Sequence, residues 1–136
     1  MSDPRAMSLF DLSTRAMSAQ MVRMNAAASN LANAGSVSST QEGAYRPIRT
    51  VFAATLDEAS GLASVESAGL VRSETPPVRR YDPGHPLADD TGHVFEAGID
   101  ETAEMVEITE SARQYQNIVQ ALQTAKQLML DTIRSK

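Results

Sequence analysis

Residues 8–34, SLFDLSTRAMSAQMVRMNAAASNLANA, contain neither proline nor glycine. At alternating steps of four and three they carry a stripe of mostly apolar side chains: Phe10, Thr14, Met17, Met21, Met24, Ala28 and Leu31. Such a heptad stripe predicts a long helix that packs against another helix. Ser8 with Asp11 predicts the start of this helix as a variant of the capping box, and Gly35 predicts its end.

A second row runs beside this stripe and widens the apolar face beyond what one partner helix would cover: Leu9, Leu12, Ala16, Ala19, Arg23 and Ala26. An apolar face of that width predicts more than one packing partner. The chain is poor in bulky apolar residues, because Leu, Ile, Val and Phe together number 27 of 136. This fraction is close to the level of about 20% below which chains tend to be disordered. We therefore expect the core to be completed by neighbouring molecules.

Residues 100–134 repeat the design of the first segment and predict a second long helix. Its heptad row is Ile108, Ala112, Tyr115, Val119, Leu122, Lys126, Met129 and Ile133, and the row beside it is Ile118, Ala121, Ala125 and Leu128. Acidic residues crowd the start of this segment, while Arg134 and Lys136 stand at its end. That distribution suits the helix dipole.

Residues 35–99 hold all seven glycines and five of the six prolines, so turns and short strands are expected there. Strands are predicted at 46–56, 62–72 and 93–95, with a polar linker at 36–43 and a stiff, extended connector at 75–86. The sequence thus predicts an α+β chain in three parts: an N-terminal helix in 1–34, a linker and small β-rich domain in 35–99, and a C-terminal helix in 100–136.

Composition excludes several classes of function. A net charge of −5 and a pI near 4.9 argue against a nucleic-acid binder, whose affinity depends on clustered Lys and Arg. The chain has no cysteine, so disulfides, thiolate nucleophiles and sulfur metal sites are excluded. The longest apolar run is 51–54, which predicts neither a transmembrane helix nor the apolar region of a cleavable signal peptide.

One cluster has the composition of a catalytic or metal site: Asp82, His85, Asp89, Asp90 and His93. Its spacing matches no zinc or calcium signature, and its residues lie among Gly and Pro where Asp is expected in turns. No Gly-x-Ser-x-Gly, GxGxxG or P-loop motif occurs. We therefore predict a turn-rich surface segment with no cofactor and no enzymatic role. A small hydrolase that uses His85, Asp89 and His93 is the alternative.

Three stretches resemble a known family. Residues 9–36, LFDLSTRAMSAQMVRMNAAASNLANAGS, resemble the amino-terminal signature of bacterial flagellar rod and hook proteins, in which a Ser-Asn-Leu-Ala-Asn-Ala element recurs. Residues 81–94, YDPGHPLADDTGHV, resemble a segment typical of a proximal rod member, and residues 110–133 resemble the family's carboxy-terminal helix. The recurring element corresponds here to Ser29, Asn30, Leu31, Ala32, Asn33 and Ala34.

The resemblance implies a structural subunit of the flagellar basal body that serves motility. It implies export through the flagellar type III apparatus, without a cleavable signal peptide, and assembly in the periplasmic space. The partners would be copies of itself and other rod proteins, which polymerise helically into a drive shaft and export channel. The terminal helices would pair as an antiparallel, coiled-coil-like hairpin in an inner tube, with the middle domain facing outward.

On this interpretation the two heptad stripes supply the seam between the helices, and the second rows supply faces for adjacent subunits. The residues predicted to pair or assemble are Phe10, Met17, Met21, Met24, Ala28, Leu31, Ile108, Tyr115, Val119, Leu122, Met129 and Ile133. Two alternatives remain. One is another flagellar axial protein of the same architecture, and the other is a helical-hairpin binding module whose apolar faces are satisfied within a monomer or dimer.

Overall fold

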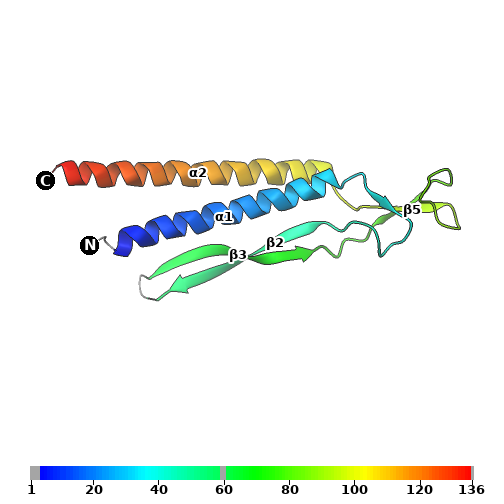
Figure 1. The fold of residues 1–136 in the computed structure, drawn as a ribbon, viewed down its shortest axis with the longest axis horizontal. Coiled ribbons are helices and arrows are strands. Elements are labelled where there is room, and N and C mark those ends of the chain that lie inside the picture. Colours follow the sequence, from blue (N-terminus) through cyan, green and yellow to red (C-terminus); the bar gives the residue numbers. More distant parts are fainter. Residues whose placement is uncertain (1–3, 59–60, 136) are drawn as a thin grey trace.

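The computed structural model describes residues 4–58 and 61–135. Along the chain, one long helix precedes the five strands and a second long helix follows them (Figure 1). In chain order the elements are α1 (Pro4–Ala32), β1 (Val37–Ser38), β2 (Ile48–Asp57), β3 (Leu62–Arg72), β4 (Val78–Tyr81), β5 (His93–Glu96) and α2 (Glu101–Arg134). The α+β class is therefore confirmed.

Helix α1 begins at Pro4, so the expected start at Ser8 is wrong. Proline is well tolerated in the first turn of a helix, because the first amide groups have no partner within the helix. The helix ends at Ala32, where Asn33 Nδ2 donates to Ser29 O at 2.9 Å and Ser36 Oγ donates to Asn33 O at 2.9 Å. Two polar side chains thus satisfy carbonyl groups at the end of the helix.

Helix α2 follows its predicted course. Asp100 is the N-cap, and its side chain accepts a hydrogen bond from the Ala103 amide at 3.2 Å. Glu101 and Glu104 lie in the first turn and Arg134 in the last, as the dipole favours. The cap explains why the helix begins immediately after Asp100.

The strands form two separate sheets. Strands β2 and β3 make an antiparallel hairpin with a bulge between Val51 and Phe52, near Gly69, whose φ is 139°. Strand β5 lies between β1 and β4 in an antiparallel three-stranded sheet. The strand at 62–72 is predicted exactly, and those at 46–56 and 93–95 are confirmed with shifts of one or two residues. Strands β1 and β4 fall within the segments predicted as linker and connector.

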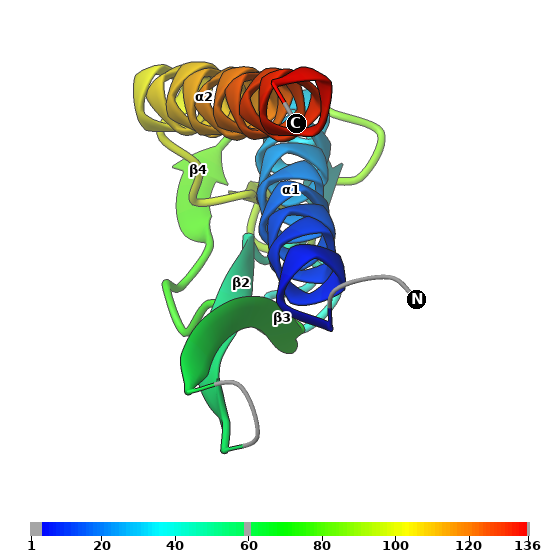
Figure 2. The ribbon, with the colours of Figure 1, turned by 90° about the vertical axis from the view of Figure 1, so that its left-hand side faces the viewer.

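Helix α1 lies between α2 and the β2–β3 hairpin, as both views show (Figures 1 and 2). The helices run antiparallel. They approach most closely where α1 ends and α2 begins, and they splay apart toward the two chain ends. The three-stranded sheet extends beyond the close end (Figure 1). The three-stranded sheet is thus connected to this end of the helix pair through the chain, whereas the hairpin packs on α1.

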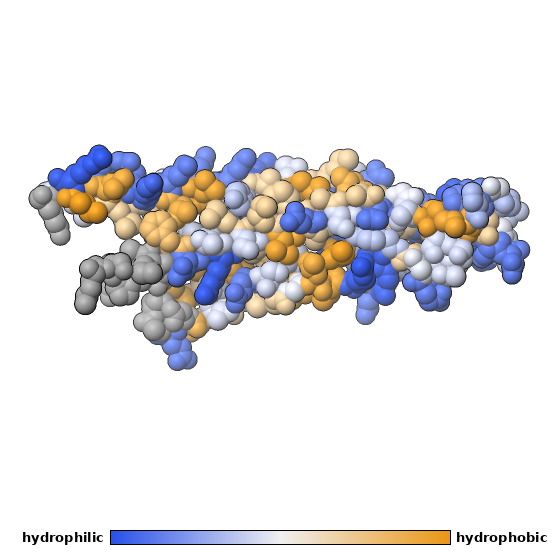
Figure 3. Space-filling model, viewed as in Figure 1, coloured by the Kyte–Doolittle hydropathy of each residue, from blue (hydrophilic) through white to orange (hydrophobic). Residues whose placement is uncertain are grey.

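The buried apolar core is small and consists almost entirely of alanine. Among the described residues its members are Ala19, Ala26, Ala27, Ala34, Ala44, Val94 and Ala97. Small side chains let helix backbones come close but bury little apolar area each. Larger apolar side chains remain at the surface, and Figure 3 shows them along the molecule. In the part of the chain that is described, no helix has the length and apolarity to cross a membrane.

We predict that Gly98→Ala destabilises the fold. A Cβ atom at this position would lie 2.8 Å from the Pro76 carbonyl oxygen and 3.4 Å from Thr75 Cγ2, so the backbone of the connector would have to move. Overpacking of this kind costs about 1–3 kcal/mol. Urea unfolding followed by circular dichroism measures the loss. Gly84→Ala is the control, because no atom lies within 4 Å of its Cβ position. Equal midpoints for the two variants would contradict the prediction.

Candidate functional site

Asn30 is fully buried at the end of α1 and is the centre of a cluster that we call the polar junction, formed by Asn30, Tyr45, Ile48, Arg49 and Glu104. Its Nδ2 donates to Ile48 O at 2.9 Å and to Glu104 Oε2 at 3.3 Å. Its Oδ1 accepts from Ile48 N at 2.7 Å and from the Tyr45 hydroxyl at 2.9 Å. An amide side chain has two donors and two main acceptor positions, and all are used.

The Asn30 amide takes the place of a neighbouring strand. Both the N–H and the C=O of Ile48, the first residue of β2, bond to this one side chain. A residue in an antiparallel ladder exchanges the same two bonds with its partner. The start of the hairpin is thereby fixed on the last turn of α1.

Glu104 brings α2 into the polar junction. Its side chain is only 2% exposed, and its Oε1 lies 2.7 Å from Arg49 Nη1 as an ion pair. Burying a carboxylate is costly unless it is paired with opposite charge and hydrogen-bonded. Here Arg49 supplies the charge at Oε1 and Asn30 donates a hydrogen bond to Oε2, while Oε1 accepts no hydrogen bond from the described residues. Because Arg49 belongs to β2, this pair also joins α2 to the hairpin.

A second polar pair lies further along the helices. Arg23 Nε donates to Glu107 Oε1 at 2.7 Å, and Nη2 contacts the same oxygen. The side chains are 25% and 33% exposed, so solvent screens this pair more than it screens Glu104. Together the two sets of contacts tie α1 to α2 at two levels.

The predicted family element lies at this site. Ser29 Oγ is 3.1 Å from the Tyr45 hydroxyl, Asn30 is the centre of the polar junction, and Asn33 satisfies the end of α1. Ala34 is buried, Leu31 is half-buried and Ala32 is exposed. The resemblance located this element but gave no role to its residues, and the structure supplies those roles.

The residues predicted for the helix seam have varied surroundings in the single chain. Half-buried are Phe10, Met17, Met24, Leu31, Ile108, Tyr115, Val119 and Leu122, whereas Met21, Ala28, Met129 and Ile133 are exposed. On α1 the buried positions Ala19 and Ala26 belong to the second row, which was expected to face adjacent subunits. The role of these predicted seam residues in an assembly stays a prediction.

Sequence reasoning missed Glu104, Arg49, Tyr45 and the Arg23–Glu107 pair. The acidic residues at the start of α2 were all interpreted as dipole partners. The sequence nevertheless contains a signal that Glu104 faces inward. Glu104 lies four residues before Ile108 and seven before Ser111, so it shares a helix face with both, and Ser111 is also buried. The inward row of α2 thus begins with a charged residue that the apolar pattern does not include.

The histidine and carboxylate cluster forms a turn. Asp89 Oδ1 accepts from Thr91 N at 2.9 Å, Thr91 Oγ1 at 2.7 Å and His93 N at 2.9 Å. His85 Nδ1 accepts from the Leu87 amide at 3.0 Å. Within residues 4–58 and 61–135, no group of three or more His, Asp or Glu is arranged to hold a metal ion. Asp89 Oδ1 and His85 Nδ1 therefore hold the backbone of the turn.

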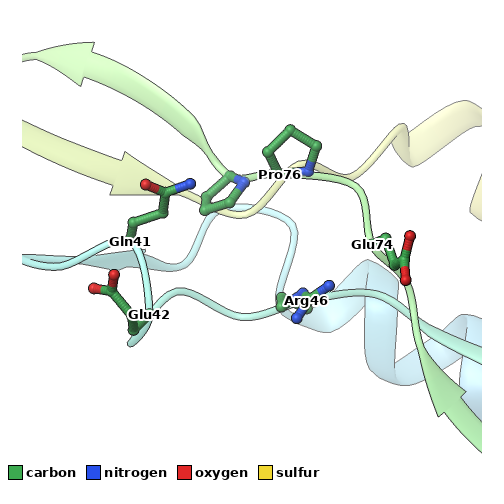
Figure 4. Close-up of a pocket in the computed structure, with 6 residues that line it drawn as sticks. Gln41, Glu42, Arg46, Glu74 and Pro76 are labelled. Atoms are coloured by element: carbon green, nitrogen blue, oxygen red, sulfur yellow. The ribbon is translucent and has the colours of Figure 1, made fainter.

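A surface depression lies between the loop before β2 and the connector after β3 (Figure 4). It is lined by Gln41, Glu42, Arg46, Glu74, Pro76 and Pro77. None of these side chains is among the buried polar groups of the described chain, and two acidic groups flank a single arginine. Without a pair of positioned titratable groups, this depression offers no catalytic arrangement.

Comparison with known proteins gives consistent results. The family model described as "Flagellar basal body rod FlgEFG protein C-terminal" matches residues 91–135. The chain is 40% identical over 129 residues to the flagellar basal-body rod protein FlgC of Salmonella typhimurium, covering 93% of this chain and 95% of that protein. It is 38% identical over 127 residues to FlgC of Escherichia coli O157:H7, with the same coverage. Identity to FlgC of Agrobacterium fabrum is 33% over 118 residues, covering 84% and 83%.

We predict that Asn30→Ala strongly destabilises the chain. The change leaves the Ile48 amide and carbonyl groups without their partner, and an unsatisfied buried polar group costs about 1–3 kcal/mol. The urea midpoint should fall accordingly. Asn25→Ala, at an exposed position on the same helix, is the matched control and should change it little. Similar midpoints would show that Asn30 does not hold the hairpin.

A pH dependence is predicted for the turn at residues 82–93. Hydrogen bonds from the His93 amide, the Thr91 hydroxyl and the Thr91 amide favour the ionised carboxylate and hold the pKa of Asp89 below its ordinary value of 3.8. The stabilisation is fully present above that value and is lost as pH falls through the lowered pKa. The protection factors of the Thr91 and His93 amides, which correct for the intrinsic pH dependence of hydrogen exchange, should fall over that range. In Asp89→Ala they should be low already at neutral pH. Protection of both amides in Asp89→Ala would refute this role.

Proposed function

The chain belongs to the family of flagellar basal-body rod proteins, and from this premise we propose how its fold builds the rod. It is a structural protein of the flagellar basal body and not an enzyme. We propose that it polymerises helically with copies of itself and with other rod proteins. The terminal helices would form the inner layer of the assembly, through residues 1–34 and 100–136, and residues 35–99 would face outward.

The single observation that carries this proposal is the free end of α2. Every residue from 126 to 135 is exposed, including the large apolar side chains of Leu128, Leu130 and Ile133 at 61%, 38% and 68%. Full burial of such a side chain contributes about 1.5–3 kcal/mol. An apolar helix end of this kind is stabilised by neighbouring subunits in a polymer.

The hairpin supports the same view. Strands β2 and β3 leave Phe52, Leu56, Val65 and Leu70 between 40% and 63% exposed. A two-stranded hairpin is only marginally stable alone in water, and this one rests on α1 along part of its length. Contacts with adjacent subunits would cover its remaining apolar surface.

The rest of the proposal follows from the family resemblance. Export would proceed through the flagellar type III apparatus, and assembly would take place in the periplasmic space. A chain with a small alanine core is suited to this route, because it has little tertiary structure of its own to unfold before export. The rod so formed would serve as drive shaft and export channel.

A monomeric helical-hairpin binding module fits the structure less well. Such a module would bury its apolar helix faces within the chain, whereas Met21, Leu128 and Ile133 are exposed here. Another axial protein of the same architecture is disfavoured, because the relatives that match nearly the whole chain are named rod proteins. A hydrolase is disfavoured, because Asp89 and His85 are both engaged by turn amides.

We predict that Met21→Asp and Ile133→Asp abolish swimming with little effect on folding. Both side chains are exposed in the single chain, at 43% and 68%, so a charge there costs little until a neighbouring subunit covers it. An unpaired charge buried in an interface costs several kcal/mol. Motility assays and electron microscopy of purified basal bodies measure the effect, and circular dichroism checks the fold.

Asn25→Asp is the matched control, because it adds the same charge at an exposed polar position one turn from Met21. It should leave motility close to that of the parent. If cells with Met21→Asp and Ile133→Asp build normal rods, neither side chain faces a subunit, and the proposed interfaces are wrong.

A further inference from the structure

The apolar pattern of the two helices does not fix how they align along their axes. The inward positions of α1 follow a heptad spacing at Ala19, Arg23, Ala26 and Asn30, and the buried residues Glu104 and Ser111 on α2 are one heptad apart. A shift of one helix by seven residues places an equivalent row against the same partner. Alanine side chains, which have no distinctive shape, oppose such a shift weakly.

The pairing of β1 with β5 joins the close ends of the helices through residues 33–36 and 97–100 and limits how far they can slide. The polar contacts then distinguish the alignments that these connectors allow. Asn30 contacts Glu104, and Arg23 contacts Glu107, in the one alignment that satisfies both. A shift of one heptad moves each partner by about 10 Å along the axis, beyond the reach of these side chains. In one direction Glu104 passes beyond the end of α1. In the other direction Asn30 lies opposite residues before α2, and Arg23, one heptad before Asn30, takes its place beside Glu104, so Glu107 loses its partner.

We propose that the contacts Asn30–Glu104 and Arg23–Glu107 select the register of α1 on α2. They act as specificity-determining pairs, and the alanine positions between them supply close packing without choosing an alignment. Buried polar groups that fix register in paired helices are a known device of helix association. The two pairs act together, because neither shifted alignment satisfies both Glu104, which is almost fully buried, and Glu107.

The selected register decides which surface other subunits meet. It places the exposed end of α2, residues 126–135, beyond the start of α1 and so determines where its apolar side chains project. This inference concerns contacts within one chain, and it can hold or fail independently of the proposed polymer.

The test uses a variant that removes the polar pairs but keeps the anchor of the hairpin. Arg23→Met, Glu104→Met and Glu107→Met together replace charged groups with a straight-chain apolar residue that favours helices. Asn30 remains and keeps its bonds to Ile48 and Tyr45. The matched control carries Glu101→Met, Glu110→Met and Arg113→Met. These changes raise the net charge of the chain by the same single unit as the test variant, but all of them lie on α2 and outside the two polar pairs.

Because the chain lacks cysteine, engineered pairs report alignment without background. Ala19 lies one turn before Arg23 and Ser111 one turn after Glu107, so in antiparallel helices Ala19→Cys with Ser111→Cys reports the native register. Ala26→Cys or Leu12→Cys, each with Ser111→Cys, reports a shift of one heptad in either direction. The full chain is oxidised in cells, and crosslinks are read by mass spectrometry in total extract and in purified basal bodies.

In the parent and the control, only the 19–111 pair should crosslink. In the triple methionine variant, a shifted pair should rise from background to a yield comparable with that of the native pair. Retention of the 19–111 crosslink alone would overturn the proposal, because the alignment would then not depend on the polar pairs. Loss of all three crosslinks would overturn it too, because the polar pairs would then hold the helices together without choosing their alignment. Absence of the parent from basal bodies would instead count against the proposed function.

Discussion

The buried amide of Asn30 is the constraint on which the rest of the structure depends. Four hydrogen bonds from one side chain meet the first residue of β2, the Tyr45 hydroxyl and Glu104 of α2. The core around it contains mainly alanine, so apolar burial alone would leave the three layers poorly oriented. Directional bonds therefore supply the orientation that bulky side chains supply in most small domains. This explains why the close end of the helix pair is also where the hairpin and the three-stranded sheet connect.

Much of the fold could be predicted from the sequence, because long periodic segments have strong local signals. Helix α2 and strand β3 have the predicted bounds within a residue, and the Gly- and Pro-rich middle contains the strands. The start of α1 was missed because Ser8 resembles a cap, whereas Pro4 is equally suited to a first turn. Strands β1 and β4 have two and four residues and exist through pairing with β5, which no local pattern reveals.

The candidate site was predictable only in part. The resemblance drew attention to Ser29, Asn30 and Asn33, but a sequence motif does not show what its side chains contact. Arg49 and Glu104 are charged residues, a type that is usually exposed to solvent, and they are 55 residues apart in the sequence. Their pairing depends on the hairpin turning back along α1. The remaining expectation, that exposed apolar residues such as Met21, Met129 and Ile133 take part in assembly, concerns surfaces that a single chain leaves open.

The splayed geometry of the helices has a mechanical consequence. Hydrogen bonds and ion pairs are concentrated at one end of the helix pair, and they resist both sliding and rotation because they depend on angle as well as distance. Toward the chain ends, Leu9, Leu128 and Ile133 offer only apolar contact, which is insensitive to small rotations. Each subunit therefore combines a torsionally stiff end with a compliant one. In the helical rod proposed above, load would pass through the stiff ends, while the compliant ends would absorb the small differences in angle between successive neighbours.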